Sequence, residues 1–328
     1  MLKLSHIPRH LAALGPFLGL AFVYLVFFFA AGESFHSLYN TKTFICQTVI
    51  IGIGALGMTL VIIAGGIDLS VGSMIALGTV VSALVLKHGA GDAAPGVLLP
   101  VLAAGGGVAA CAVCGCLNGA VSSLGRIVPF IVTLGMMQII HGTAKWLAEE
   151  TTVNPPDNWL NQMMIVEPQI DVWYSVAPGV WVMVGLTVLM AAVLRYTTFG
   201  RHVFAIGSNE ATARLCGIRV RLTRIWVYTL CGVLTGVASV MQLSNLTIGD
   251  PAAGDGMELN IIAAVVIGGG SLNGGEGSVL GSLLGALMMA VLRNGCNQVD
   301  IPTYVQNIVI GAIIILAVGL DGLRRRGT

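Results

Sequence analysis

The sequence predicts an all-α integral membrane protein with about ten transmembrane helices, some of them short or broken. Three observations predict this class. Of the 328 residues, 56% are hydrophobic and 9% are charged, whereas roughly 25% of the residues in a soluble domain are charged. The apolar residues gather into runs that approach the roughly 20 residues needed to cross a bilayer. The 44 glycines suit the close helix–helix packing found in membranes.

Ten apolar runs are predicted to be spans, and together they form one transmembrane domain over 1–328. The first run is too long for the core of a signal peptide and has no clear cleavage site, so we expect it to remain as a span. Two runs near the C-terminus are short, so the count is about ten rather than a fixed number. The predicted spans are 11–31, 43–64, 71–87, 97–120, 128–147, 179–195, 225–243, 259–270, 278–293 and 304–320.

The positive charges predict the orientation. An even number of spans places both termini on one side, and a cytoplasmic assignment puts 12 of the 16 Lys and Arg residues there, as the positive-inside rule requires. The twelve are Lys3, Arg9, Arg126, Arg195, Arg201, Arg214, Arg219, Arg221, Arg224, Arg324, Arg325 and Arg326. The other four are Lys42, Lys87, Lys145 and Arg293, which fall outside the spans or near their outer ends.

The largest basic, water-facing segment runs from Arg195 to Arg224 and contains a predicted cytoplasmic loop over 196–224. A short helix is predicted inside it. Its signals are Ser208 or Asn209 as N-cap, Glu210 at the positive N-terminal end, Arg214 in the last turn and Gly217 as C-cap. A capped helix between two spans suits the docking of a soluble partner. The alternative is an ordinary basic loop on the positive side.

Two glycine-rich breaks interrupt the apolar runs, GGIDLSVGS from Gly65 to Ser73 and GGGSLNGGEGS from Gly268 to Ser278. Backbone at membrane depth leaves the helix only where protein or water satisfies its polar groups, and paired interrupted helices often mark a substrate route. The alternative is a tight cytoplasmic turn at each break, with the acid as a cap. The likeness of the breaks hints at an internal duplication in which both preceding spans run inward.

Polar residues in or beside the spans supply the candidate pathway. We expect Asp68 at a helix end, where its carboxylate accepts backbone N–H bonds and Ser70 helps to cap the helix. The candidate pathway or helix-break residues are Gly65, Gly66, Asp68, Ser70, Gly72, Asn118, Asn245, Asn260, Asn273 and Glu276.

The longest predicted external loop covers 148–178 and carries acidic and aromatic residues, including Trp159, Trp173 and Tyr174. These aromatics suit an interfacial belt. The alternative is a landing surface for an external partner.

Several chemical motifs are missing from the sequence. All seven cysteines lie in or beside apolar runs, so no disulfide framework is indicated, and Cys111, Cys114 and Cys116 read as small helix residues rather than a metal site. No lysine stands in a G-x-x-x-x-G-K-[ST] phosphate loop, and neither H-E-x-x-H nor G-x-S-x-G occurs. The sequence therefore predicts no enzyme activity and no bound cofactor or metal, and any nucleotide-driven work falls to another chain.

Three segments resemble one known family. GMTLVIIAGGIDLSVGS, from Gly57 to Ser73, is similar to the signature of the ribose-type permeases of bacterial ABC sugar importers. TFGRHVFAIGSNEATARLCGI, from Thr198 to Ile218, resembles that family's cytoplasmic coupling segment. AAVVIGGGSLNGGEGSVLG, from Ala263 to Gly281, is similar to its late glycine-rich segment. One departure is Ala64, where the family often has Thr.

The resemblance implies a bundle of about ten membrane helices in the bacterial inner membrane and a set of partners. These are a second permease copy or sister permease, a cytoplasmic ABC ATPase that uses ATP and Mg, and a periplasmic sugar-binding protein. The implied coupling residues are Gly200, Arg201, Gly207, Asn209, Glu210, Arg214 and Gly217. Membrane lipid is an expected contact and nucleic acid is not.

The expected cargo is a neutral monosaccharide, a pentose or hexose, moved by alternating access. A permease for an anionic cargo would place Arg or Lys in its pathway, and the predicted spans hold no such cation at depth. Two alternatives stay open: a nucleoside or sugar-derived signal importer of the same family, and an ion-coupled secondary transporter. The latter class often carries paired intramembrane carboxylates or histidines, for which only Asp68 and Glu276 are candidates here. No catalytic constellation supports a membrane-embedded enzyme.

Overall fold

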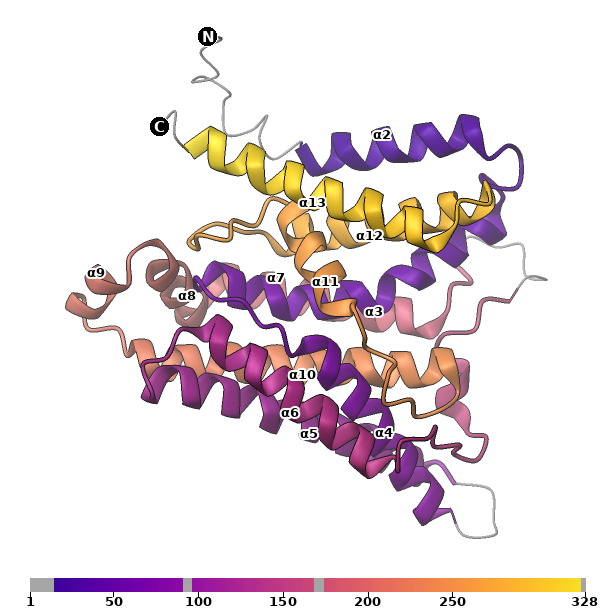
Figure 1. Ribbon diagram of the computed structural model, residues 1–328, viewed down its shortest axis with the longest axis horizontal. Coiled ribbons are helices and arrows are strands. Elements are labelled where there is room, and N and C mark those ends of the chain that lie inside the picture. The colour runs from indigo at the N-terminus through magenta and orange to yellow at the C-terminus, as the bar shows by residue number, and fades with distance from the viewer. Residues whose placement is uncertain (1–14, 91–95, 168–173, 326–328) are drawn as a thin grey trace.

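The computed structural model describes residues 15–90, 96–167 and 174–325, and these residues form a bundle of helices (Figure 1). Lys3, Arg9, Trp173 and Arg326, used in the predictions above, lie outside the described residues. The helices are α2 (Gly15–Ala30), α3 (Leu38–Ile63), α4 (Val71–Gly89), α5 (Leu98–Leu124), α6 (Pro129–Leu147), the short 3-10 helix η1 (Trp159–Gln162), α7 (Pro178–Tyr196), α8 (Thr198–Ser208), α9 (Glu210–Leu215), α10 (Val220–Leu246), α11 (Met257–Ile267), α12 (Val279–Gln298) and α13 (Thr303–Arg325).

Each of the ten predicted spans overlaps one helix, but the count of about ten membrane crossings is not confirmed. Within the described residues, six helices are long and apolar enough to cross a membrane: α3, α4, α5, α7, α10 and α12. The physical reason is clearest for α11, which has 11 residues and is therefore about 16 Å long, against a hydrocarbon core of about 30 Å.

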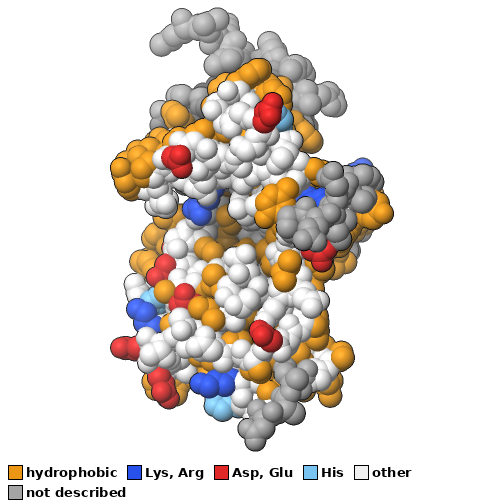
Figure 2. All heavy atoms as spheres, turned by 90° about the vertical axis from the view of Figure 1, so that its right-hand side faces the viewer, with side chains coloured by type: hydrophobic (Ala, Val, Ile, Leu, Met, Phe, Trp, Pro, Cys, Tyr) orange, Lys and Arg blue, Asp and Glu red, His pale blue; other side chains and the backbone are white. Residues whose placement is uncertain are grey.

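One end of the bundle carries α8 and α9, and we call it the α8–α9 end. Figure 1 shows α8 and α9 at the left, and α13 also ends toward the left. Figure 2 faces the opposite end, where acidic and basic side chains are scattered in small groups and hydrophobic side chains border the face.

The helices α5 and α10 pack tightly because glycines face each other. Gly115 and Gly119 stand four residues apart on α5, and Gly232 and Gly236 do so on α10. A β-carbon on Gly115 would lie 3.1 Å from the Gly232 Cα, and one on Gly232 would collide with the carbonyl of Cys111. Small residues at this spacing let two backbones approach closely in a membrane. Here the glycine-rich composition acts as predicted.

The helix α4 begins in the middle of the bundle rather than at one end. The α3–α4 connection leaves the α8–α9 end and runs back along the bundle (Figure 1). Gly66 on this connection packs against the Tyr228 hydroxyl, and Gly78 on α4 packs against Ser239. Both partners belong to α10, which spans Val220–Leu246. The first residue of α4 therefore lies level with the centre of α10.

The helix α11 begins beside the start of α4. The loop after α10 turns back along α4: Gly249 lies against Ala83 and Thr79, and the Thr79 hydroxyl donates to the Asp250 carbonyl at 3.3 Å. Further on, the backbones of Gly254 and Gly72 touch. The helices α4 and α11 thus meet N-terminus to N-terminus, and we call them the two half-helices because both begin in the middle of the bundle. From this meeting point α11 runs back to the α8–α9 end, while α4 runs the other way.

Replacing Gly232 with Leu should separate α5 from α10 and lower the free energy of unfolding by at least about 1–3 kcal/mol, because an added side chain has no room at this contact. The measurement is the thermal unfolding midpoint in detergent. Gly105→Leu is the matched control, since a β-carbon there meets nothing within 4 Å. Equal midpoints for the two variants would contradict this account of the packing.

Candidate functional site

Three motifs that lie far apart in the sequence meet at the α8–α9 end. The Ile63 carbonyl, at the end of α3, accepts a hydrogen bond from the Gly275 amide at 2.9 Å. A β-carbon on Gly207, in the last turn of α8, would collide with the same carbonyl, and one on Gly274 would lie 2.9 Å from the Gly65 Cα. The first break, the second break and the end of α8 therefore form one backbone junction. Gly65, Gly274 and Gly275 have φ values of 77°, 85° and 76°, a region that favours glycine.

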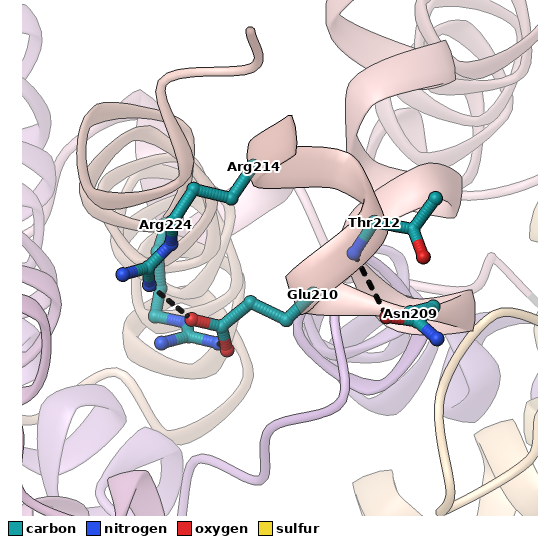
Figure 3. Close-up of polar contacts among 5 residues, drawn as sticks. All are labelled: Asn209, Glu210, Thr212, Arg214 and Arg224. Carbon is teal, nitrogen blue, oxygen red and sulfur yellow. Dashed lines mark hydrogen bonds and ion pairs between the residues drawn. The ribbon is translucent and has the colours of Figure 1, made fainter. Parts of the chain in front are cut away.

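The short helix predicted in the basic loop is present as α9, and its N-cap is Asn209, one of the two predicted, while the predicted C-cap, Gly217, lies one residue beyond the observed one. The Asn209 side chain is the N-cap and accepts the Thr212 amide at 2.9 Å (Figure 3). Glu210 lies in the first turn and Arg214 in the last. Gly217 follows the C-cap residue Cys216 with φ 83°, the left-handed conformation that ends many helices.

Glu210 holds α9 against the bundle. Its carboxylate accepts Arg214 Nη2 at 2.7 Å within α9 and Arg224 Nη2 at 2.9 Å from α10 (Figure 3). Partial burial alone would raise the pKa of Glu210, but its hydrogen bonds and ion pairs with Arg224 and Arg214 outweigh burial and lower the pKa below its usual 4.5. Because the carboxyl pKa of Glu210 is lowered, its ion pairs with Arg214 and Arg224 stabilise the fold at neutral pH. This stabilisation is lost as the pH falls through the lowered pKa.

The remaining coupling candidates divide into packed and exposed residues. Gly200 lies against the backbone of Leu194, at the end of α7, so its role in the structure is to let α8 turn sharply after α7. Arg201 is exposed. The sequence analysis missed Leu215, the last residue of α9, whose side chain is 88% exposed. Its apolar character beside the charged Arg214 is a signal that the sequence contained.

Asp68 forms the centre of a fully buried polar cluster on the α3–α4 connection. One oxygen accepts the Ser70 amide at 2.9 Å and the Ser70 hydroxyl at 2.6 Å, and the Asn118 amide on α5 donates to the carboxylate at 3.3 Å. Thr133 on α6 donates to the Ile67 carbonyl at 3.1 Å. The break is therefore held open by side chains from α5 and α6. Of the two readings proposed from sequence, this first break is an interrupted segment inside the bundle and not a tight turn.

The prediction for Ser70 was wrong in one respect. Ser70 stands at the N-cap position of α4 but makes no side-chain capping bond. The reason is that its hydroxyl donates to Asp68 instead, and Asn118 Nδ2 donates to the Ser70 oxygen at 2.8 Å. The start of α4 is thus left without a side-chain cap.

An open pocket of about 240 Å³ lies where the two half-helices meet. It is lined by Ser73 of α4, by Met137, Gln138 and His141 of α6, and by Gly254, Asp255, Gly256 and Glu258 at the start of α11. Its lining includes two carboxylates, of Asp255 and Glu258, as well as neutral hydrogen-bonding groups, but neither Lys nor Arg. The neutral cargo expected from the predicted spans is compatible with such a lining.

Known proteins match the chain over nearly its whole length. Residues 40–318 match the family described as "Branched-chain amino acid transport system / permease component". The chain is 37% identical over 299 residues to the ribose import permease protein RbsC of Escherichia coli strain K12, a match that covers 89% of this chain and 88% of that relative. It is 32% identical over 323 residues to the fructose import permease protein FrcC of Rhizobium meliloti, with 97% and 88% covered. It is also 32% identical over 310 residues to the L-arabinose ABC transporter permease protein AraH of Azospirillum brasilense, with 94% and 88% covered. No solved structure matches the chain.

The chain belongs to the ribose-type family of ABC importer permeases. It is a membrane transport subunit, and the family resemblance read from its three motifs is confirmed.

The structure does not gather the permease's other pathway candidates at one place. Asn245 is exposed near the far end of α10. Asn273 and Glu276 are exposed on the second break, which lies at the α8–α9 end as a turn. Gly72 lies at the meeting of the half-helices, while Asn260 on α11 accepts Arg293 Nη2 of α12 at 3.1 Å.

Two cations lie deeper than predicted. The span predicted to end at 293 continues to Gln298, so Arg293 lies within α12 and bonds to Asn260. Lys42, predicted near an outer span end, lies in the first turns of α3 with its side chain only 2% exposed. Neither residue lines the open pocket, so the argument for a neutral cargo now depends on that pocket and not on an absence of buried cations.

Sequence reasoning missed the acids of the open pocket, Asp255 and Glu258. Their signal was the segment PAAGDGME, in which glycines and acids precede an unusually short apolar run. Because the loop before α11 turns back along α4, these acids line the open pocket, where Asp255 is exposed and Glu258 is half-buried.

Asp68→Leu should impair the permease more than Asp68→Asn. Leucine leaves the Ser70 amide and the Ser70 hydroxyl without their acceptor, at about 1–3 kcal/mol for each buried group left unpaired, while the Asn118 amide keeps the Ser70 oxygen as acceptor. Asparagine keeps one oxygen acceptor. The measurements are the unfolding midpoint in detergent and transport by the assembled importer. Near-normal values for both variants would show that the buried cluster does not support the fold.

Proposed function

We propose that the chain is the permease subunit of an ABC importer that carries a neutral monosaccharide, a pentose or hexose, across the bacterial inner membrane. The observation that carries this proposal is the set of full-length relatives named for ribose, fructose and L-arabinose import. These relatives are 32–37% identical to the chain and are named for three different neutral sugars. They therefore support the class of cargo and leave the individual sugar open.

The proposed orientation places the α8–α9 end and both termini in the cytoplasm, with 1–328 as one transmembrane domain. The described arginines of the loop from Arg195 to Arg224 support this orientation through the positive-inside rule. The segment 148–178 then faces outward, where the periplasmic sugar-binding protein would deliver cargo. A second permease copy or a sister permease would complete the pathway, and the exposed apolar face of α6, with Phe130, Ile131 and Ile139, suits either that partner or lipid.

In this proposal a separate cytoplasmic ATPase, which binds ATP and Mg, docks on α9. The exposed Leu215 would enter an apolar recess of the ATPase, while Arg214 contributes a charged rim, an arrangement common at the centre and edge of protein interfaces. The Glu210–Arg224 pair, at 2.9 Å, would carry a displacement of α9 directly into α10.

The route from docking to cargo continues through the junction at Gly207. Because the end of α8 touches the ends of both breaks, a shift of α8 would move the α3–α4 connection and α11 together. The half-helices α4 and α11 would then change their contact in the middle of the bundle. Alternating access follows if this contact opens the pathway to each side in turn.

Reconstituted permease should import a labelled neutral monosaccharide only with its ATPase, its binding protein and ATP. The permease alone, in vesicles with a proton or sodium gradient, should show no concentrative uptake, because it lacks a phosphate loop and its exposed α9 requires a partner. The control is the full importer with an ATPase variant that cannot hydrolyse ATP. Gradient-driven accumulation by the permease alone would instead support an ion-coupled transporter.

Replacing Leu215 with Ser should weaken docking of the ATPase by about tenfold or more, since loss of an apolar anchor at the centre of an interface commonly costs over 1 kcal/mol. The measurement is the affinity of the purified ATPase for detergent-solubilised permease. Leu222→Ser is the matched control, because Leu222 is also exposed, at 47%, but lies on α10. An unchanged affinity for Leu215→Ser would place the docking contact elsewhere on the α8–α9 end.

A further inference from the structure

We propose that the open pocket between α4, α6 and α11 binds the hydroxyl groups of the cargo, with Glu258, Gln138 and Ser73 as its hydrogen-bonding residues. This inference rests on the proposed import of a neutral monosaccharide and assigns to that function a cargo site within this chain. It depends on four features of the pocket: its depth, an unpartnered hydroxyl, a positioned carboxylate and the absence of cations.

The pocket lies at the level where a cargo must pass between the two sides. The start of α4 is level with the centre of α10, which has 27 residues and is about 40 Å long. The pocket opens beside α6, whose residues Gln138 and His141 contribute to its lining. The pocket is therefore open at the surface of the chain and is not a closed core cavity.

Ser73 supplies a hydrogen-bonding group that the fold leaves unused. Its side chain is only 7% exposed and lines the pocket. Among the described residues no group forms a hydrogen bond with its hydroxyl. This hydroxyl is open to the pocket, so it is free both to donate a hydrogen bond to the hydroxyl of a bound sugar and to accept one from it.

Glu258 is held in the pocket by the close approach of two half-helices. Its carboxylate occupies the space that a side chain at position 72 would need, and only because Gly72 has no β-carbon can the carboxylate reach the start of α4. Glu258 also lies in the first turn of α11, where a negative charge is favourable. The carboxylate is thus fixed by packing, as a residue that accepts hydrogen bonds from a cargo should be.

The neighbouring acid is already engaged. Asp255 Oδ1 lies 3.5 Å from His141 Nδ1, so this pair forms one wall of the pocket and leaves Glu258 as the acceptor for cargo. Gln138 lies on α6, as His141 does, is exposed in the pocket lining and offers both a donor and an acceptor.

This set of groups selects for the chemistry of the cargo. Sugar hydroxyls donate to a carboxylate and accept from an amide or a hydroxyl, and the pocket provides all three. With two acids and neither Lys nor Arg, it disfavours a sugar phosphate or a sugar acid. Its volume of about 240 Å³ lies below the roughly 300–1,000 Å³ of pockets for drug-sized ligands, which suits a single small sugar.

The first test uses the whole importer, reconstituted with its ATPase and binding protein. Glu258→Gln should lower the number of sugar molecules imported per ATP hydrolysed by about tenfold, because it replaces a charged acceptor oxygen with an NH2 donor. Gln138→Leu should lower it by at least about threefold, because it removes a donor and an acceptor from the cargo site. The ATPase rate should change less than about twofold. Gln138 is exposed, so its variant tests the site even if Glu258→Gln assembles poorly. Thr143→Val is the matched control, since Thr143 lies on α6 and its hydroxyl bonds only within that helix, to Ile139 at 2.8 Å.

The second test measures occupancy directly. Gln138→Cys is made in a chain in which the exposed Cys116 and Cys216 are replaced by Ser, and the rate of modification by a small thiol reagent is followed in the assembled importer. The imported sugar should slow modification at position 138 at least about threefold and should leave a Thr143→Cys variant unaffected.

The outcomes separate this inference from the function on which it rests. Normal sugar import per ATP by Glu258→Gln and Gln138→Leu, with no protection at position 138, would overturn the pocket assignment and leave sugar import intact. A wild-type importer that carries branched-chain amino acids and no monosaccharide would overturn the function itself. Protection by an amino acid but not by any sugar would overturn the assignment of hydroxyl recognition.

Discussion

The backbone contact between Gly72 and Gly254 is the constraint on which the arrangement of the bundle depends. Two helices can meet N-terminus to N-terminus inside a membrane only if neither carries a side chain at the contact and if their unpaired amides find protein or water. Both glycines lack a β-carbon that would collide with the other backbone. The contact fixes where α4 and α11 begin, so it also fixes the position of the open pocket and of Glu258.

A second backbone contact relates this centre to the α8–α9 end. The connection that leads into α4 begins at Gly65, directly after Ile63, and the helix α11 ends just before the second break. Gly207, in the last turn of α8, touches both Ile63 and Gly275 of the second break. A displacement at α8 therefore reaches α4 at its start, through the α3–α4 connection, and α11 at its end, through the second break. In a close-packed interior such a displacement is transmitted and not absorbed. The Asp68 cluster stiffens the first of the two routes, because three hydrogen-bond donors hold its carboxylate.

Local patterns predicted what depends on local physics. The ten ranges overlap helices because long apolar runs suffice to identify them. The ends of α9 were predicted to within one residue because Asn209 and Gly217 act within one turn. The structure differs where contacts between distant residues decide. Ser70 donates to Asp68 instead of capping α4, Glu210 pairs with Arg224 as well as with Arg214, and the acids of PAAGDGME line a pocket because the loop turns back along α4. Hydropathy alone does not reveal a loop that re-enters the bundle.

The two glycine-rich breaks illustrate how similar sequences lead to different structures. In the second break, Gly269, Gly274 and Gly275 all have positive φ, and the Ser271 amide donates to the Glu276 carbonyl at 3.1 Å, so the chain closes on itself as a turn. In the first break only Gly65 has positive φ, and the residues that follow are bonded to α5 through Asp68 and to α6 through Ile67. The first therefore leads the chain back toward the centre, while the second remains at the α8–α9 end.

This asymmetry bears on how docking is tested. A bulky residue at Gly207 would collide with Ile63 and Gly275 and disturb both breaks at once, and Glu210→Lys would set three positive charges together at the base of α9. Loss of transport in either variant would be explained equally well by damage to the permease and by loss of ATPase docking. Only a docking residue outside these contacts, such as Leu215, distinguishes the two causes.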